Sequence, residues 1–78
     1  MSGITEPELM NLVDLEVITG AYFNEVENGY ILTVQYGKNK EERLKVARGH
    51  FRVFKNANFA ITYVKEMGLS SVAFYFEA

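Results

Sequence analysis

The fold is decided by the stretch RGHFRVFKNANFAITYVKEMGLSSVAFYF, residues 48–76. It opens with an alternation around Phe51 and Val53, which is the period of a β-strand with two different faces. The apolar residues that follow recur at helical spacing and form one stripe, which predicts a helix over 57–67. Alternation returns over 72–76 and predicts a closing strand. The stretch therefore reads as strand, helix, strand.

Local signals mark both ends of this helix. Asn56 offers a side-chain oxygen at the helix start, with Asn58 as the alternative cap. Gly68 follows the last turn, where a left-handed residue closes a helix, and Leu69 is placed to fold back on that turn. The two flanking strands can share one sheet through a right-handed crossover. The closing strand then lies either beside the strand before the helix or beside the first strand of the chain.

Composition points to one small domain, residues 1–78, with a net charge of −2 and no cysteine. The lack of cysteine excludes disulfides and thiolate metal sites and favours a reducing compartment, so we expect a cytoplasmic protein. Six Phe and five Tyr are expected to supply most of the buried area. We expect no signal peptide and no membrane span, because no apolar run approaches the roughly 18–20 residues that cross a bilayer.

The N-terminal part predicts a helix over 5–14. Thr5 is placed to cap it, and Glu8, three residues on, completes a capping box. Ile4 and Leu9 occupy the two positions of a hydrophobic staple, whose contact fixes the entry of the chain into the helix.

A hairpin is expected next, with strands over 17–26 and 30–36 and the two-residue turn Asn28-Gly29 between them. This turn implies the following register: Val26 opposite Ile31, Phe23 opposite Val34, and Ala21 opposite Tyr36. Alternation then predicts a core face made of Ala21, Phe23, Tyr30, Leu32, Val34 and Tyr36.

Residues 37–42 read as a charged turn and 43–47 as a third strand, with Leu44 and Val46 inward. Gly49 interrupts the alternation and predicts a bulge or bend. The predicted order is α-β-β-β-α-β. The fold class is α+β, with a four-stranded, mainly antiparallel sheet and the helices packed on one face.

Charge is segregated along the chain. Residues 1–37 sum to −6, residues 38–55 to +5 and residues 56–78 to −1, which together give the net −2. Such segregation suggests complementary electrostatics, either inside the fold or between molecules.

The most informative candidate for function is a basic strip along the outer face of the third strand and its continuation past Gly49. Its members are Arg43, Lys45, Arg48, His50, Arg52 and Lys55. A positive strip on a sheet could match an acidic partner protein, track phosphates, or simply protect a solvated edge from pairing. Because the net charge is negative, we expect another protein as the partner and keep nucleic acid as the alternative.

Tyr22, Ile31 and Tyr75 are expected to leave the outer face of the sheet partly apolar. An exposed apolar patch on a small domain often marks an interface, although scattered surface aromatics are also common. The partner-binding candidates are therefore the basic strip together with Tyr22 and Tyr75. A homodimer through an edge strand or through this face is a further hypothesis.

The sequence offers no catalytic constellation. His50 is the only histidine, which excludes a histidine metal cluster, and no serine or aspartate stands at the spacing of a nucleophilic triad. The neighbours Glu41 and Glu42 are a carboxylate pair in sequence only, whereas a glycosidase pair needs opposition across a cleft. We therefore expect a non-enzymatic binding protein without cofactor or metal.

Several motifs together resemble those of small plasmid-borne proteins described as ParC-type and partition-associated. The matching segments are Glu8-Leu9-Met10, NGYILTV at 28–34, Ala47-Arg48-Gly49-His50-Phe51-Arg52-Val53-Phe54, Met67-Gly68-Leu69 and the strand 72–76. The chain departs from the pattern at Asn58-Phe59, where shorter polar or small residues are expected. The resemblance implies an accessory protein of a plasmid or phage that acts by binding.

Small α+β proteins without catalytic groups are also similar in kind to anti-CRISPR proteins, which inhibit a CRISPR–Cas effector by occupying its surface. In that alternative the acidic segment 1–37 would mimic phosphate. The carboxylates that it would present are Glu6, Glu8, Asp14, Glu16, Glu25 and Glu27. A nucleic-acid-binding sheet module is the second alternative.

Overall fold

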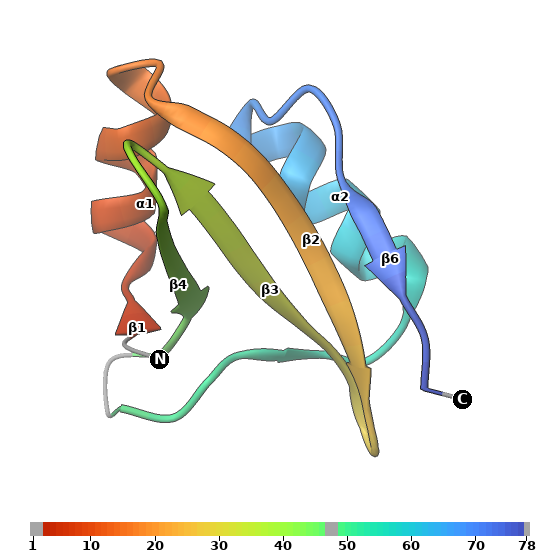
Figure 1. Ribbon diagram of the computed structural model, residues 1–78. Helices are drawn as coiled ribbons and strands as arrows, with labels where there is room; N and C mark the ends of the chain where they lie inside the picture. Colours follow the sequence, from red (N-terminus) through yellow and green to blue (C-terminus); the bar gives the residue numbers. More distant parts are fainter. Residues whose placement is uncertain (1–2, 47–48, 78) are drawn as a thin grey trace.

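The computed structural model describes residues 3–46 and 49–77, which form two helices and a six-stranded mixed sheet (Figure 1). The elements in chain order are β1 (Gly3–Ile4), α1 (Glu6–Asp14), β2 (Ile18–Val26), β3 (Gly29–Tyr36), β4 (Lys40–Leu44), β5 (Val53–Phe54), α2 (Ala57–Met67) and β6 (Ala73–Tyr75). The strand order is β1-β4-β3-β2-β6, and β5 pairs with β3 beyond the end of β4. The pairs β1–β4 and β2–β6 are parallel and the others antiparallel. The predicted α+β class is confirmed.

The predicted start of α1 is confirmed in its local hydrogen bonds. The Thr5 hydroxyl accepts from the Glu8 amide at 3.4 Å, and the Thr5 amide donates to Glu8 Oε1 at 2.9 Å. The bond from the Thr5 amide, and then the one that the Thr5 hydroxyl donates to the same Glu8 oxygen at 2.9 Å, hold the pKa of Glu8 below its ordinary value. The staple residues Ile4 and Leu9 are both buried in the core.

Both ends of α2 are also as predicted. The side chain of Asn56 accepts from the Phe59 amide at 3.0 Å. Gly68 ends the helix at φ 98°, in the left-handed region, and the Leu69 amide donates back to the Val64 carbonyl at 3.0 Å. The closing strand β6 lies parallel to β2, so the crossover joins it to the first long strand and not to β5.

The predicted hairpin register is wrong by two residues. Val26 pairs with Gly29, which makes Glu27-Asn28 the turn, and Phe23 consequently pairs with Leu32. Gly29 is instead the first residue of β3, where it has φ 149°. A Cβ at this position would overlap the Phe54 carbonyl oxygen, because β5 pairs with β3 next to it. A shift of two residues keeps every side chain on its expected face, so the predicted core face is unaffected.

The third strand differs from its predicted bounds. It begins at Lys40 and ends at Leu44, after which the chain leaves the edge of β3 and returns to it at Val53. Gly49 has φ 85° within a tight reversal, as the predicted bend required, and Lys45 pairs antiparallel with Phe51. The reversal leaves Val46 exposed, whereas the sequence placed it inward. β4 and β5 therefore share one edge of β3, separated by this excursion.

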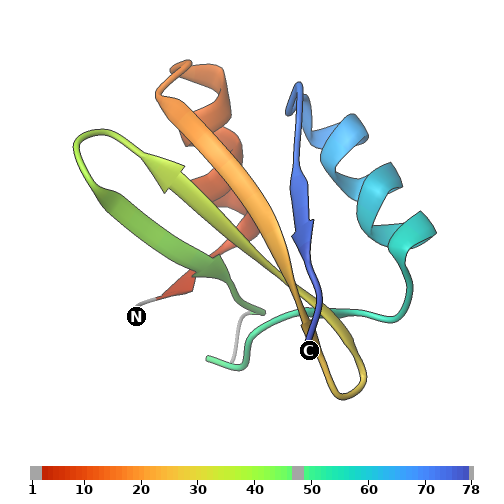
Figure 2. The ribbon, with the colours of Figure 1, turned by 45° about the vertical axis from the view of Figure 1, so that its right-hand side comes forward.

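Both helices cover the same face of the sheet, and the core lies between this face and the helices (Figures 1 and 2). The buried residues of the core are Ile4, Leu9, Phe23, Leu32, Val34, Leu44, Phe54, Ala60 and Val64. Phe23 is its centre, stacked on Phe74 at 4.9 Å and edge-on to Phe54 at 5.5 Å between ring centroids. The opposite face of the sheet carries no helix and is called the open face below.

Candidate functional site

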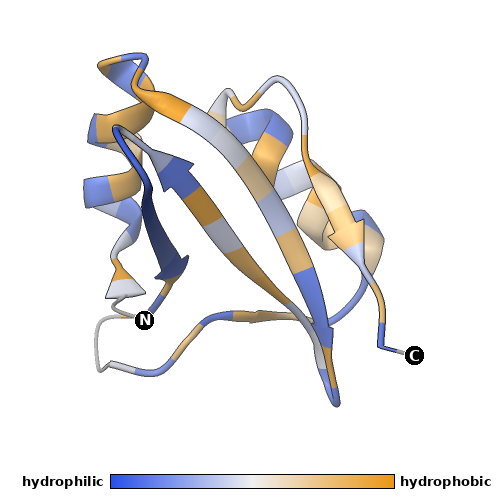
Figure 3. Ribbon diagram, in the orientation of Figure 1, coloured by the Kyte–Doolittle hydropathy of each residue, from blue (hydrophilic) through white to orange (hydrophobic). Residues whose placement is uncertain are grey.

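The open face is built by the side chains that alternate away from the core. Strand pairing brings them together from five strands: Tyr22, Asn24, Ile31, Thr33, Gln35, Glu41, Arg43, Val53, Ala73 and Tyr75. Figure 3 shows that β4, at one side of this face, is hydrophilic except at its last residue, Leu44, whereas β6 is mostly apolar. The face therefore has a charged side and an apolar side.

The apolar side centres on two tyrosines that the sequence singled out. Tyr22 and Tyr75 meet edge to face, with ring centroids 5.5 Å apart. Tyr75 is 58% exposed and Val53 is 42% exposed, with the half-buried Ile31 paired to Val53 across β3 and β5. These side chains form an apolar patch at the surface, which we call the tyrosine patch (Tyr22, Ile31, Val53 and Tyr75).

A polar network holds one edge of the tyrosine patch in place. The Tyr22 hydroxyl donates to Glu41 Oε1 at 3.1 Å, and Gln35 Nε2 donates to Glu41 Oε2 at 2.8 Å. Burial, and then the bond to Glu41, raise the pKa of Tyr22. Thr33, which pairs with Tyr22 and Arg43, is fully buried although it lies on the open face. The Tyr22 side chain is thus held by a hydrogen bond at its hydroxyl and by the ring of Tyr75.

The basic residues do not form the single outer strip that the sequence predicted. Arg43 lies on the open face, with its guanidinium 5.3 Å from the centre of the Phe51 ring. Arg52 turns to the helix side instead, 4.8 Å from the ring centre of Phe54 and 4.7 Å from that of Tyr63. The reversal at Gly49 is the reason, because it folds the expected strand back on itself.

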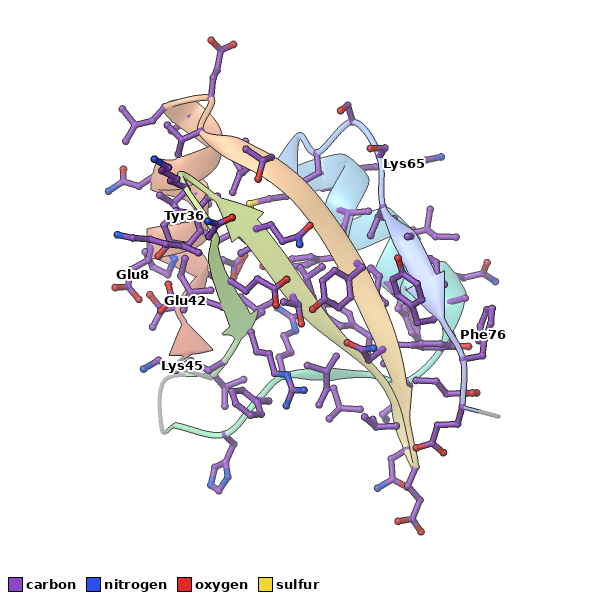
Figure 4. The ribbon with its side chains drawn as sticks, in the orientation of Figure 1. Glu8, Tyr36, Glu42, Lys45, Lys65 and Phe76 are labelled. Atoms are coloured by element: carbon purple, nitrogen blue, oxygen red, sulfur yellow. The ribbon has the colours of Figure 1, made fainter. Side chains whose placement is uncertain are left out.

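The other members of the predicted strip are scattered around this reversal. Lys45 is half-buried against Gly3 at the β1 edge, far across the sheet from Phe76 (Figure 4). His50 is exposed at the reversal and Lys55 is exposed between β5 and α2. Arg48 lies outside the described residues. Arg43, Lys45 and His50 thus remain as a looser group, the cationic end, beside the open face.

The carboxylates are also divided. Glu41 and Glu42 point to opposite faces of the sheet, and Glu42 accepts a hydrogen bond from the Tyr36 hydroxyl at 2.7 Å on the helix side (Figure 4). That bond raises the pKa of Tyr36. Among the six carboxylates proposed as phosphate mimics, Glu6, Glu8 and Asp14 lie on α1, Glu16 follows that helix, and Glu25 and Glu27 lie at the far hairpin. They do not line a single strip.

Sequence reasoning missed two features. Val53 joins the open face only because β5 pairs with β3, which no local pattern indicates. A groove between α1 and α2 was also missed, although the four-residue spacing of Glu6, Met10 and Asp14 was a signal for it. Within residues 3–46 and 49–77 no group of three potential metal ligands occurs, and none of the described helices is long and apolar enough to cross a membrane.

No protein-family model, no curated protein and no solved structure matches this chain. The relationship to ParC-type proteins stays a prediction from the sequence motifs, as does the anti-CRISPR alternative.

Proposed function

We propose that this protein is a cytoplasmic, non-enzymatic binding domain that acts by contact with another protein through its open face. The observation that carries the proposal is the placement of both helices on one side of the sheet, which leaves the tyrosine patch uncovered. Apolar patches with a polar rim mark protein interfaces, and tyrosine is enriched in their energetically important centres. The accessory role in a plasmid or phage, implied by the ParC-type resemblance, is part of this proposal.

The cationic end suggests the chemistry of the partner. Arg43 lies on the open face, and its guanidinium contacts the ring of Phe51, which pairs with Lys45 and follows His50. Glu41, by contrast, accepts hydrogen bonds from Tyr22 and Gln35. A partner surface with an apolar centre and carboxylates at one end would complement this arrangement. Such complementarity steers association and selects between partners more than it adds affinity.

Nucleic acid is less well supported as the partner. Phosphate tracking needs several cations on one surface, because each neutralised phosphate contributes through counterion release. Of the six basic residues in the predicted strip, Arg52 stacks on aromatic rings at the helix side and Lys55 lies beyond β5. The open face itself presents Arg43 alone among the described residues of that set.

The proposal is tested by photo-crosslinking in the native host. Benzoylphenylalanine replaces Tyr75 or Val53 on the open face, and it replaces Lys65 in the matched control, since Lys65 is exposed on α2, away from the open face. We expect one protein adduct of the same mass from positions 75 and 53, none from position 65, and a several-fold weaker adduct when Arg43→Glu is added. Adducts of equal yield from all three positions, or no protein adduct from 75 and 53, would contradict the proposal.

The same experiment separates the alternatives. An adduct with twice the mass of the chain would identify a homodimer through the open face. An adduct that nuclease treatment removes would support the nucleic-acid alternative, and an adduct to a CRISPR–Cas effector subunit would support the anti-CRISPR one.

A further inference from the structure

We propose that the groove between α1 and α2 binds a basic helical segment of a second protein, one that carries Lys or Arg, an apolar residue and again Lys or Arg at four-residue spacing. The groove has a volume of about 190 Å³. We call it the helix groove, and its lining residues are Glu6, Met10, Asp14, Tyr63, Glu66 and Met67. It lies in the helix layer, on the side of the molecule away from the open face.

The wall contributed by α1 has a regular pattern. Glu6, Met10 and Asp14 follow one another at intervals of four residues, so they form a row along one side of the helix, away from the buried Leu9. The row therefore reads acid, apolar, acid over two turns. A helix laid alongside it with the inverse pattern would place a cation at each carboxylate and an apolar side chain on Met10.

The opposite wall extends the same chemistry. Tyr63, Glu66 and Met67 stand three and four residues apart on α2, so they also share one side of that helix. Met10 is 50% exposed and Met67 is half-buried, which gives the groove an apolar floor of flexible thioethers. Methionine surfaces adapt their shape to a bound apolar side chain, as grooves that receive helices commonly require.

The charges around the groove favour a cationic occupant. Its lining holds three carboxylates and no Lys or Arg. Arg52, the residue before β5, lies 4.7 Å from the centre of the Tyr63 ring, and its charge opposes that of Glu6 there. Asp14 and Glu66, at the other end, have no such neighbour in the lining, so they carry the attraction.

A metal ion fits this groove poorly, because no group of three potential ligands occurs among the described residues. A helical segment fits better, since an amphipathic helix lays its side chains into a groove at intervals of three and four residues. Two binding surfaces on opposite sides would let the domain bridge two proteins. This inference is independent of the proposed function of the open face, because its test measures binding at residues of the helix groove only.

The test follows the methyl signals of Met10 and Met67 by NMR during titration with a designed peptide. The peptide is a 15-residue helix with Lys, Leu and Lys at four-residue spacing, and the matched peptide has the same composition in a scrambled order. We expect both methyl signals to shift with the first peptide. The Kd should rise about 3- to 10-fold in Glu66→Lys, which replaces an exposed ion pair by a repulsion.

Glu27→Lys is the matched protein control, because it makes the same charge change in an exposed turn far from the groove. Its Kd should equal that of the unaltered protein. The inference is overturned if neither methyl signal shifts, if the scrambled peptide binds equally well, or if Glu27→Lys weakens binding as much as Glu66→Lys. Methyl shifts that depend on protein concentration alone would assign the groove to a second copy of this chain and would also overturn it.

Discussion

At the scale of single residues, Arg52 shows how a side chain leaves the surface that its sequence position suggests. Alternation put it on an outer strip, but its guanidinium stacks on Phe54 and Tyr63 at 4.8 and 4.7 Å. A planar, weakly hydrated guanidinium gains from contact with aromatic faces, and its aliphatic stem can cover apolar surface. Tyr63 is thus partly enclosed by the guanidinium of Arg52, and the negative charge of Glu6 also acts on it.

This enclosure predicts a loss of stability at alkaline pH. Burial, and then the negative charge of Glu6, raise the pKa of Tyr63 from 10.0 to about 12. A raised pKa means that the folded state favours the neutral phenol. The contribution of Tyr63 to the free energy of unfolding is therefore complete below about pH 10, and it is lost as the pH rises towards about 12.

The measurement is the free energy of unfolding in urea at a series of alkaline pH values, for the unaltered protein and for Tyr63→Phe. The unaltered protein should lose stability more steeply, because Tyr22 and Tyr36 titrate in both proteins and Tyr63 in one only. Parallel curves would show that Tyr63 ionises in the folded state as it does in the unfolded chain.

At the scale of elements, the two helices were predictable and the strand edges were not. The caps of α1 and α2 involve residues no more than five apart, so their hydrogen bonds can be inferred from order alone. The hairpin register depended on β5, more than twenty residues away, because Phe54 approaches the backbone of Gly29. The predicted turn Asn28-Gly29 was wrong, because the turn is Glu27-Asn28 and Gly29 is the first residue of β3, where it allows that close approach.

Gly29→Ala should therefore be strongly destabilising. The new Cβ would overlap the Phe54 carbonyl oxygen and would also hold alanine at a positive φ. Gly37→Ala is the control, since Gly37 has φ 56° but nothing within 4 Å of a Cβ. We expect Gly37→Ala to lose about 1 kcal/mol of unfolding free energy and Gly29→Ala at least about 1 kcal/mol more. Equal losses in urea denaturation would mean that β5 does not lie tightly against β3.

At the scale of the whole molecule, stability depends on a single layer of side chains between the sheet and the helices. Phe23 is completely buried there and makes ring contacts with Tyr30, Phe54 and Phe74. A domain of this size has a total stability near the lower end of about 5–15 kcal/mol, so losing one such ring is a large fraction of it.

Phe23→Ala should cost about 3–5 kcal/mol, because it removes buried area and leaves a cavity. Phe59→Ala removes a ring that is 61% exposed and should change the stability by less than about 0.5 kcal/mol. Phe23→Leu removes less buried volume and should lose less stability, so it can still be measured if Phe23→Ala does not fold. Urea denaturation followed by circular dichroism checks all three. A Phe23→Leu variant as stable as Phe59→Ala would contradict the central place of Phe23.

The candidate site follows the same division between near and distant contacts. Tyr22 and Tyr75 could be named from alternation, since a shift of register by two residues leaves the faces unchanged. Their ring centroids lie 5.5 Å apart only because β6 pairs with β2. The sequence had left two possible neighbours for that closing strand. The basic strip was assigned by extending one strand past Gly49, where the chain reverses, and so Arg52 was placed on the wrong side.

By itself, the order of residues determined the α+β class, both helices with their caps, and the inner and outer faces of the two hairpin strands. These properties depend on neighbours within a few positions, where covalent geometry and periodicity limit the choices. Only the tertiary structure decided the hairpin register, the partner of β6, the excursion between β4 and β5, and the uncovered face with its tyrosine patch. Those depend on which distant segments bury the most apolar surface together, a competition that is resolved only when the whole chain packs.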